Sequence, residues 1–452
     1  MKTIGKYTIV GLLGRGGMGK VYRVSIPVIE KIVALKYLSP HPHLVHLLGK
    51  SAIHRLFLQE ASLMAKIRHP HVAPVLDFGE TNGHLYYIME YHCHNLGAFI
   101  GETYRTEIPS RPIPVDKAIE YTRQILSGLR RLHMSGIVHR DIKPYNILID
   151  DEEKLKICDF GLSRLRGESI RIPSQLKVGS PCYAAPEQSI SPDHAEPSAD
   201  IYSVGVMLYR MLAGALPKQK PIILHHFNPD LAPLWDEFLR HCLDPSPDRR
   251  FQSADEMKTA LDMMAHYWEK KKAVVCLLEK ETLRVHTGKT YHQRSEPMKI
   301  TQDRAREIFE LDRRWRPKHF PENLFITSVD ETTLHDRNTG LVWEKGGWPY
   351  TLNWPEAVDR IEQMNRDGFG GLRCWRIPTV PEIVTIMRRS PKAGDLCFPA
   401  DFDPRHRWLW SADRRTYTSQ WYVNMDMGYV GYQDRTAALY LKAVAIAPGE
   451  YS

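Results

Sequence analysis

The chain has 452 residues, of which 43% are hydrophobic and 25% charged, and its formal net charge is +8. This composition is typical of a folded globular protein and excludes a disordered chain. The length exceeds the roughly 100–200 residues of one domain, so we expect more than one hydrophobic core. The modest positive charge favours contact with nucleotides or acidic partners, but it does not indicate a nucleic-acid-binding protein.

Cysteine usage and hydropathy predict where the protein works. The seven cysteines are scattered and form no C-x-x-C pair, which argues against a disulfide framework or a zinc site. Residues Met1–Tyr7 lack an apolar signal core, and runs such as Ala273–Leu278 are too short for a membrane helix. We expect a cytoplasmic protein that contacts neither membrane nor nucleic acid.

The first pattern is a glycine-rich loop after a predicted strand at Tyr7–Val10. Residues Gly14–Val21 read G-x-G-x-x-G-x-V. Glycines at this spacing let backbone N–H groups approach phosphates closely. Dinucleotide-binding folds use a similar loop but continue into a helix. Residues Val21–Val24 alternate as a strand, which favours a nucleotide loop between two strands.

Three further elements follow in the N-terminal part. Residues Ile32–Lys36 form an apolar strand that ends in a lysine. A helix is predicted over Leu56–Met64, and it carries Glu60, which is either the carboxylate partner of Lys36 or a charge on a solvated face. The alternating run Leu85–Met89 predicts a buried strand.

The stretch His139–Asn146 is the centre of the chain, and it is followed by two short motifs. Residues Leu155–Cys158 predict a strand that leads into Asp159–Gly161, and Ala185–Glu187 reads A-P-E. A lone H-R-D triplet is compatible with an ordinary surface loop. The occurrence of all these patterns in one order and at consistent distances makes that interpretation untenable.

This set resembles the motifs of bacterial serine/threonine kinases of the eukaryotic type, over roughly residues 1–266. The resemblance implies a two-lobed α+β kinase fold that uses ATP and Mg²⁺ to phosphorylate Ser or Thr hydroxyls of proteins, including itself. It implies that Asp141 is the base and that Lys143 neutralises the γ-phosphoryl charge. It also implies that Asn146 and Asp159 hold the metal.

The same resemblance assigns the nucleotide site. Lys36 would contact the α- and β-phosphates and be oriented by Glu60, and the segment after Leu85–Met89 would receive the adenine. The ATP-binding residues expected are Gly14, Arg15, Gly16, Gly17, Met18, Gly19, Val21, Ala34, Lys36, Met89, Glu90 and His92.

An activation segment is expected over Leu162–Ala184. Ser169 and Ser174 are the expected autophosphorylation sites, because an arginine fork such as that of Arg140 matches phosphate oxygens. Ser180 would face the catalytic residues, and Glu187 would pair with Arg250. Ile142, Tyr145 and Ser180 depart from the commoner family residues, but no catalytic atom is lost. The alternative hypothesis is a pseudokinase-type scaffold that binds nucleotide and recruits partners.

Residues 267–318 are rich in lysine and arginine, and we expect a solvated linker there, with binding of an acidic partner as the alternative. Residues 319–452 form the last expected domain, which contains most of the chain's ten tryptophans. A helix is predicted by the stripe Trp354, Ala357, Val358, Ile361 and Met364, and a capping box is predicted at Thr379 and Glu382.

The runs Thr339–Trp343 and Trp375–Thr379 resemble a bacterial domain of unknown function whose relatives include the C-terminal domain of a collagen-like adhesin. The resemblance implies a smaller, C-type-lectin-like α+β fold that acts as a sensor or docking module. Its ligand would be a small molecule, a glycan or a protein. The tryptophans either stack on sugar rings or form the core.

Overall fold

The structure is a computed structural model, and it describes residues 2–103, 106–160, 164–165, 182–190, 196–217, 224, 231, 233–278, 293–321, 323–388, 397, 399 and 401–446. The chain divides into two compact units, Met1–Leu277 and Leu278–Ser452, and each is described by itself. Among the described residues, no helix combines the length and apolar composition that a membrane crossing requires.

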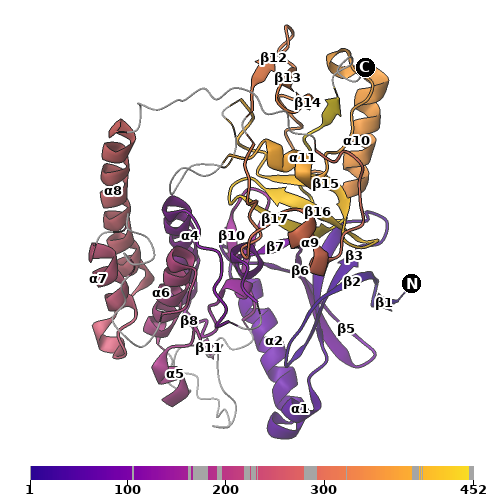
Figure 1. Ribbon diagram of the computed structural model, residues 1–452. Helices are drawn as coiled ribbons and strands as arrows, with labels where there is room; N and C mark the ends of the chain where they lie inside the picture. Colours follow the sequence, from indigo (N-terminus) through magenta and orange to yellow (C-terminus); the bar gives the residue numbers. More distant parts are fainter. Residues whose placement is uncertain are drawn as a thin grey trace. The chain divides into compact units, whose positions relative to one another are not determined.

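The first unit begins with an antiparallel sheet in the order β1-β2-β3-β4-β6-β5 (Figure 1). Its core contains buried residues such as Val24, Val33 and Ile88, and β4 and β6 are buried along most of their length. The strands are β1 (Thr3–Ile4), β2 (Tyr7–Arg15), β3 (Gly19–Ser25), β4 (Ile32–Leu38), β5 (Val75–Thr81) and β6 (His84–Glu90).

Two helices, α1 (Pro42–Leu48) and α2 (Lys50–Lys66), follow β4. Helix α2 buries Ile53, Phe57 and Met64, which recur at helical spacing, and it packs beside β5 and β6. Glu60 lies on this same buried face. The packing of the apolar stripe therefore fixes which way the Glu60 side chain points.

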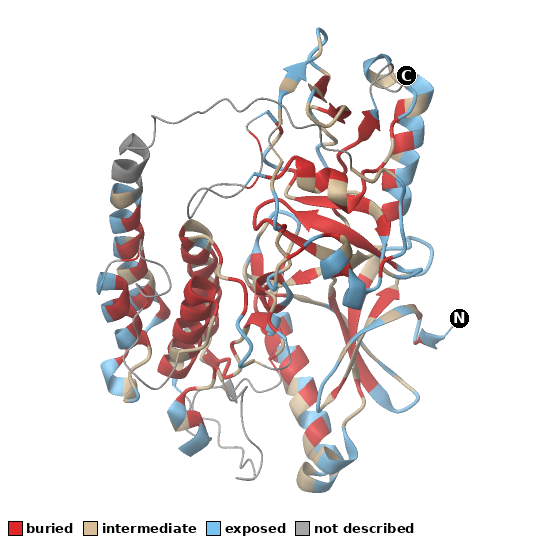
Figure 2. Cartoon of the chain, viewed as in Figure 1, coloured by how far each residue is buried: buried red, intermediate tan, exposed pale blue. Residues whose placement is uncertain are grey.

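The large lobe is built around two adjacent helices, α4 (Val115–Met134) and α6 (Pro197–Ala213). Helix α6 is apolar on nearly all sides, and Figure 2 shows it buried along its length. The other helices are α3 (Leu96–Ile100), α5 (Pro186–Ile190), α7 (Pro233–Cys242) and α8 (Ala254–Leu278). The short strands are β7 (His94–Asn95), β8 (Ile137–Val138), β9 (Ile147–Ile149), β10 (Leu155–Ile157) and β11 (Arg164–Leu165).

Helix α8 continues past the expected domain end at residue 266. Trp268 is only 4% exposed, and its indole Nε1 donates a hydrogen bond to Asp116 at 2.9 Å. The indole joins α8 to the first turn of α4. The first unit therefore extends beyond His266.

The second unit contains two antiparallel sheets, β12-β13-β14-β18 and β15-β16-β17. The first comprises β12 (Phe325–Thr327), β13 (Thr333–Asp336), β14 (Leu341–Glu344) and β18 (Val444–Ile446). The second comprises β15 (Trp408–Arg414), β16 (Ser419–Asn424) and β17 (Tyr429–Asp434). The helices are α9 (Gln302–Ile308), α10 (Trp354–Asp367) and α11 (Val380–Thr385).

Helix α10 buries Trp354, Ala357, Ile361 and Met364 of the predicted stripe, whereas Val358 is 36% exposed. The predicted capping box of Thr379 and Glu382 begins α11. The two observations agree with helix periodicity and capping chemistry.

Most of the tryptophans of this unit form its core. Those at positions 343, 354, 375, 408, 410 and 421 are all at most 7% exposed, while Trp348 is intermediate. Trp421 stacks on Trp315 with ring centroids 5.8 Å apart. Rings buried in this way are not available to stack on a sugar.

The structure differs from the expectation of a solvated linker over residues 267–318. Ile300, Ala305, Phe309 and Leu311 are buried in the same core cluster as Trp421. Arg294 also forms a two-pronged ion pair with the buried Asp413, with both N–O distances 2.8 Å. The segment is folded into the second unit because the apolar residues of α9 and its flanks are buried, although its composition is basic.

Candidate active site

Three charged side chains from distant parts of the chain meet in the first unit. The Lys36 ammonium on β4 donates to Glu60 Oε1 at 2.6 Å and to Asp159 Oδ1 at 2.8 Å. Asp159 follows β10 and is 123 residues from Lys36 in sequence. The structure therefore brings together three residues that the sequence analysis assigned to phosphate and metal binding.

Tyr87 completes the surroundings of Glu60. Its hydroxyl donates to Glu60 Oε1 at 2.8 Å, and its ring packs against Phe57 of α2. The sequence analysis did not assign Tyr87 to the site. The apolar run Leu85–Met89 of β6 is buried throughout, Tyr87 included, but nothing in the sequence indicates the contact with Glu60.

The electrostatics of this cluster favour a charged lysine. Burial alone would lower the pKa of the Lys36 ammonium, but the carboxylates of Asp159 and Glu60 outweigh it and hold that pKa well above its ordinary value. The Lys36 charge in turn holds the pKa of Asp159 below its usual range. Asp159 is therefore ionised at neutral pH.

A second cluster lies in the loop before β9. The Lys143 ammonium donates to Asp141 Oδ2 at 2.7 Å, and the Asn146 amide donates to the same oxygen at 3.1 Å. The amide also donates to the Asp141 carbonyl at 2.8 Å. Because these hydrogen bonds fix its orientation, the Asp141 carboxylate is held as an acceptor.

A buried carboxylate fixes the backbone of the loop that carries Asp141. Asp200 of α6 accepts hydrogen bonds from the backbone N–H groups of His139 and Arg140 at 2.9 and 2.7 Å. Arg140 and Asp159 have φ values of 70° and 65°, a backbone region that non-glycine residues rarely adopt. Such strain persists only where surrounding contacts fix the chain, and it is concentrated at functional sites.

The glycine-rich loop joins β2 and β3. A Cβ added to Gly14, Gly16 or Gly17 would meet no atom within 4 Å, whereas one on Gly19 would lie 2.1 Å from the Tyr37 carbonyl oxygen. Packing thus explains glycine only at position 19. The open space at the other three fits a phosphate-bearing ligand that the backbone must approach.

The donor set fits a magnesium ion held mainly by phosphates. Asp159 is partly exposed, and its second oxygen accepts no hydrogen bond among the described residues. Those residues also include no group of three or more Asp, Glu, His and Cys side chains that would cage a metal. Mg²⁺ typically takes one or two carboxylates together with substrate phosphates.

The residues expected at the adenine lie at the end of β6. Met89 pairs with Ala34 across the sheet, and Val21 pairs with Lys36. The Glu90 carboxylate is bound by Lys156 at 2.6 Å and lies 3.5 Å from His92. The Glu90 side chain therefore ties β6 to β10, so only its backbone is suited to contact a nucleotide base.

The rest of the expected activation segment is described in part. Arg250 forms a two-pronged ion pair with Glu187, with both N–O distances 2.7 Å. Gly161, Ser169, Ser174 and Ser180 lie outside the described residues.

The sequence analysis missed a buried group beneath the catalytic loop. The Glu102 carboxylate accepts a hydrogen bond from the Tyr183 hydroxyl at 2.9 Å and lies 3.9 Å from Arg210. The Tyr145 hydroxyl donates to the Glu102 carbonyl at 2.5 Å. Tyr145 therefore connects the catalytic loop to this group, which gives its departure from the commoner acidic residue a structural role.

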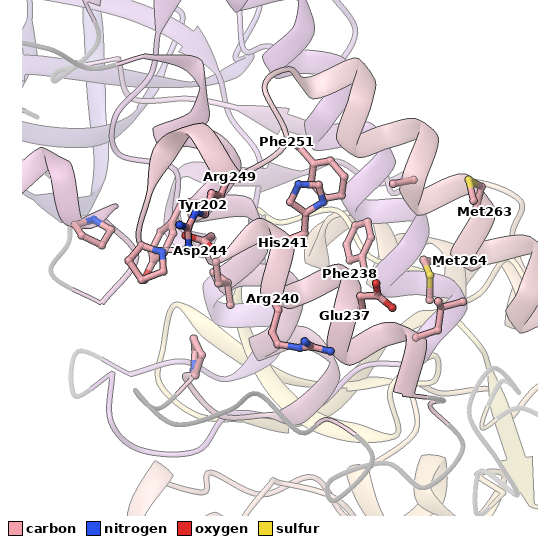
Figure 3. Close-up of a pocket in the computed structure, with 16 residues that line it drawn as sticks. Tyr202, Glu237, Phe238, Arg240, His241, Asp244, Arg249, Phe251, Met263 and Met264 are labelled. Carbon is pink, nitrogen blue, oxygen red and sulfur yellow. The ribbon is translucent and has the colours of Figure 1, made fainter.

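A cavity of about 990 Å³ lies elsewhere in the first unit (Figure 3). Its walls come from α5 to α8 and include Phe238, His241 and Phe251, whose rings pack together. None of the expected catalytic or nucleotide-binding residues lines it. The size of a cavity therefore does not locate the chemistry in this molecule.

Comparison with known proteins identifies both units. Residues 7–272 match the protein kinase domain family, and residues 332–445 match the Lcl C-terminal domain family. The serine/threonine-protein kinase pkn2 of Myxococcus xanthus is 33% identical over 224 residues, which cover 48% of this chain and 25% of that protein.

Two other bacterial relatives are similar over a longer stretch. PksC of Streptomyces coelicolor is 32% identical, covering 56% of this chain and 48% of that protein. PknE of Mycobacterium tuberculosis is 32% identical, covering 57% and 45%. The matches thus span less than half the length of these curated relatives. The chain belongs to the protein kinase family, with bacterial serine/threonine kinases among its relatives, and carries an Lcl C-terminal domain.

Proposed function

We propose that the first unit transfers the γ-phosphoryl group of ATP to Ser or Thr hydroxyls of proteins, including this chain itself. The observation that carries the proposal is the convergence of Lys36, Glu60 and Asp159 within hydrogen-bonding distance. In a protein kinase, the lysine–glutamate pair and the metal-binding aspartate must both be in place for phosphoryl transfer.

When bound, Mg²⁺·ATP supplies the phosphoryl group and the divalent charge that screens it. The residues that would hold the ion are Asn146 and Asp159. The glycine-rich loop and Lys36 bind the phosphates. Asp141 accepts the proton of the substrate hydroxyl, and Lys143 offsets the charge on the transferring group.

The charges at the site agree with this assignment. Glu60, Asp141 and Asp159 provide three carboxylates, and Lys36 and Lys143 provide two ammonium groups. The excess negative charge favours a divalent cation. The ammonium groups then remain close enough to bind phosphate oxygens.

The test compares Asp141→Asn with Asp159→Ala. Loss of the base should lower turnover by about 100- to 10,000-fold while nucleotide binding is retained. Loss of Asp159 should weaken Mg²⁺-dependent nucleotide binding as well. The measurements are ³²P transfer to a generic basic protein and titration with a fluorescent ATP analogue.

The control is Asp151→Asn, the same change at an exposed turn position of the same unit. Near-normal transfer in both site variants would contradict the proposal. A wild-type chain that binds nucleotide without transferring phosphate would instead support the scaffold alternative.

We further propose autophosphorylation at Ser169 or Ser174, with Arg140 receiving the phosphate. Arg140 directly precedes the proposed base Asp141, and its planar guanidinium group can bind two phosphate oxygens at once. Phosphopeptide mapping of chain incubated with Mg²⁺ and ATP should find one of the two sites modified. Modification elsewhere only would refute this assignment.

The C-terminal unit is proposed to act as a sensor or docking module of lectin-like type for a small molecule, glycan or protein. Its Lcl match and its separate core support a self-contained module. A proteolytic or recombinant fragment of this unit that retains ligand binding would support the role. Loss of binding in a folded fragment would argue against it.

A further inference from the structure

The second unit contains a small, strongly basic cavity. Its volume is about 300 Å³, at the lower end of the range for ligand pockets. It lies where the segment Pro297–Lys299 meets the end of β15. Its polar lining residues are Lys299, Arg414, Thr416, Tyr417, Gln420 and Arg435.

Backbone pairing places two of the cations side by side. The Ile300 N–H donates to the Arg414 carbonyl at 2.8 Å, and the Arg414 N–H donates to the Met298 carbonyl at 2.9 Å. Lys299 and Arg414 are therefore directly opposite in a parallel bridge. Both cationic groups also flank the exposed Tyr417 ring, at 5.0 and 5.6 Å from its centroid.

Among the residues that the structure describes, no carboxylate balances these charges. The lining residues include no Asp or Glu. Within the described part of the chain, no side chain forms an ion pair with Lys299, Arg414 or Arg435. Asp413 is next in sequence to Arg414, but its carboxylate is bound by Arg294 and by two backbone N–H groups. Like charges directly opposite in a sheet destabilise it, so this arrangement lacks a counter-ion.

Two buried polar atoms at the cavity also have no hydrogen-bond partner among the described residues. They are the Arg435 Nε and the side-chain Oε1 of Gln420, which pairs with Arg414 across β15 and β16. Buried polar groups are normally satisfied, and exceptions call for an explanation. A half-turn of the Gln420 amide would present its NH₂ group as a further donor.

These features together favour a multivalent anion. A phosphate monoester carries a charge of about −1.5 to −2 and three strong acceptor oxygens, which match several cationic donors better than one carboxylate does. Tyr417 offers an apolar surface for the chain that bears the phosphate. We propose that this cavity binds the phosphate group of a phosphoserine or phosphothreonine in a protein.

The choice of a protein-bound phosphate rests on the proposed function, because the first unit would produce such groups. The probe is a synthetic peptide of residues 167–178 with phosphate on Ser174. The comparison arms are the same peptide without phosphate and inorganic phosphate alone. Binding to the full chain is measured by fluorescence anisotropy in the absence of ATP, at two salt concentrations.

We expect the phosphopeptide to bind at least tenfold more tightly than the unphosphorylated peptide. Arg414→Gln and Lys299→Gln should each remove most of that preference, because each deletes one cation of the cavity. Arg366→Gln should retain it, since Arg366 is an exposed arginine of α10 that does not line the cavity. In thermal unfolding, the phosphopeptide should raise the Tm of the wild-type chain but not that of the cavity variants.

Equal affinity for the two peptides, or a preference that persists in both cavity variants, would overturn the proposal. If inorganic phosphate binds as tightly as the phosphopeptide, the ligand is the free ion. That result would overturn the proposal that the cavity binds a phosphorylated residue of a protein. The same titration on Asp141→Asn separates the two proposals. If the inactive Asp141→Asn chain still prefers the phosphopeptide, the phosphate-binding cavity is supported even though the chain has no kinase activity. If an active chain shows no preference, the cavity proposal is refuted and the kinase proposal stands.

Discussion

The two units carry their charged groups in opposite ways. In the first, ammonium groups and carboxylates converge, as Lys36 does with Glu60 and Asp159. In the second, Lys299 and Arg414 lie side by side in a cavity without a carboxylate. The first arrangement suits a cation-bound nucleotide, and the second suits a lone anion. The difference indicates that charge balance within a site, rather than the net charge of the chain, determines which ligand fits.

The largest expected effect beyond loss of the base concerns the Lys36–Glu60 pair. Lys36→Met should lower kcat/KM by about 100-fold or more, because misplaced phosphates lose their alignment with the acceptor. Glu60→Gln should have a similar effect, and the double variant should be less than additive. Additive losses would mean that the pair does not act as a unit. Lys66→Met, an exposed change on the same helix, is the control.

The second prediction concerns the aromatic core that distinguishes the second unit. Trp421 is fully buried against Trp315 and Phe309. Trp421→Ala should destabilise this unit by about 3–5 kcal/mol. Trp348→Ala should cost less, because Trp348 is partly exposed. Chemical unfolding followed by tryptophan fluorescence measures both, and equal losses would show that Trp421 is not central to the core.

A smaller effect is expected from pH. Burial, together with the nearby Lys442 charge, lowers the pKa of His406 to about 4. The unfolded imidazole takes up a proton near pH 6.5, whereas the folded one does not. The free energy of unfolding of the second unit should therefore be highest above about pH 6.5. It should fall by about 1–3 kcal/mol between pH 6.5 and 4, as the unfolded imidazole takes up its proton.

The check is the free energy of unfolding across this pH range for wild type, His406→Gln and the exposed control His319→Gln. The charged groups near the His406 ring are those of Lys442, Asp403 and Arg405. All three proteins contain them, so they do not cause a difference in slope between wild type and the variants. An unchanged slope in His406→Gln would rule out this histidine as the origin of the pH dependence.

The kinase fold predicted from the sequence is confirmed, and Lys143 and Asn146 lie against Asp141 as expected, whereas the roles of these residues stay predictions. The sequence did not predict the contact of Tyr87 with Glu60, or the group of Glu102, Tyr183 and Arg210, since these depend on tertiary packing. The linker expectation was misled by lysine and arginine counts. The apolar residues on and beside α9, such as Ile300 and Phe309, were the better indicator that this segment is folded, because they are buried in the core.

The basic cavity could not be predicted from the sequence either, because it too depends on tertiary packing. Lys299, Arg414 and Arg435 come from three separate segments and form no motif. Only the bridge between Lys299 and Arg414 reveals that they are neighbours. The lectin-like assignment likewise stays a prediction, because the structure shows a mixed α/β unit with buried tryptophans.

The central claim is that the first unit alone carries the phosphoryl-transfer chemistry. The most direct test compares the full chain with fragments ending at Leu277 and at His266, in ³²P transfer to a generic basic protein. The fragment 1–277 should be folded, with turnover within about threefold of the full chain, because no residue of the second unit is assigned to the site. The fragment 1–266 should be less stable, because it lacks the buried Trp268 that binds Asp116. A fragment 1–277 that is folded but inactive would contradict the claim.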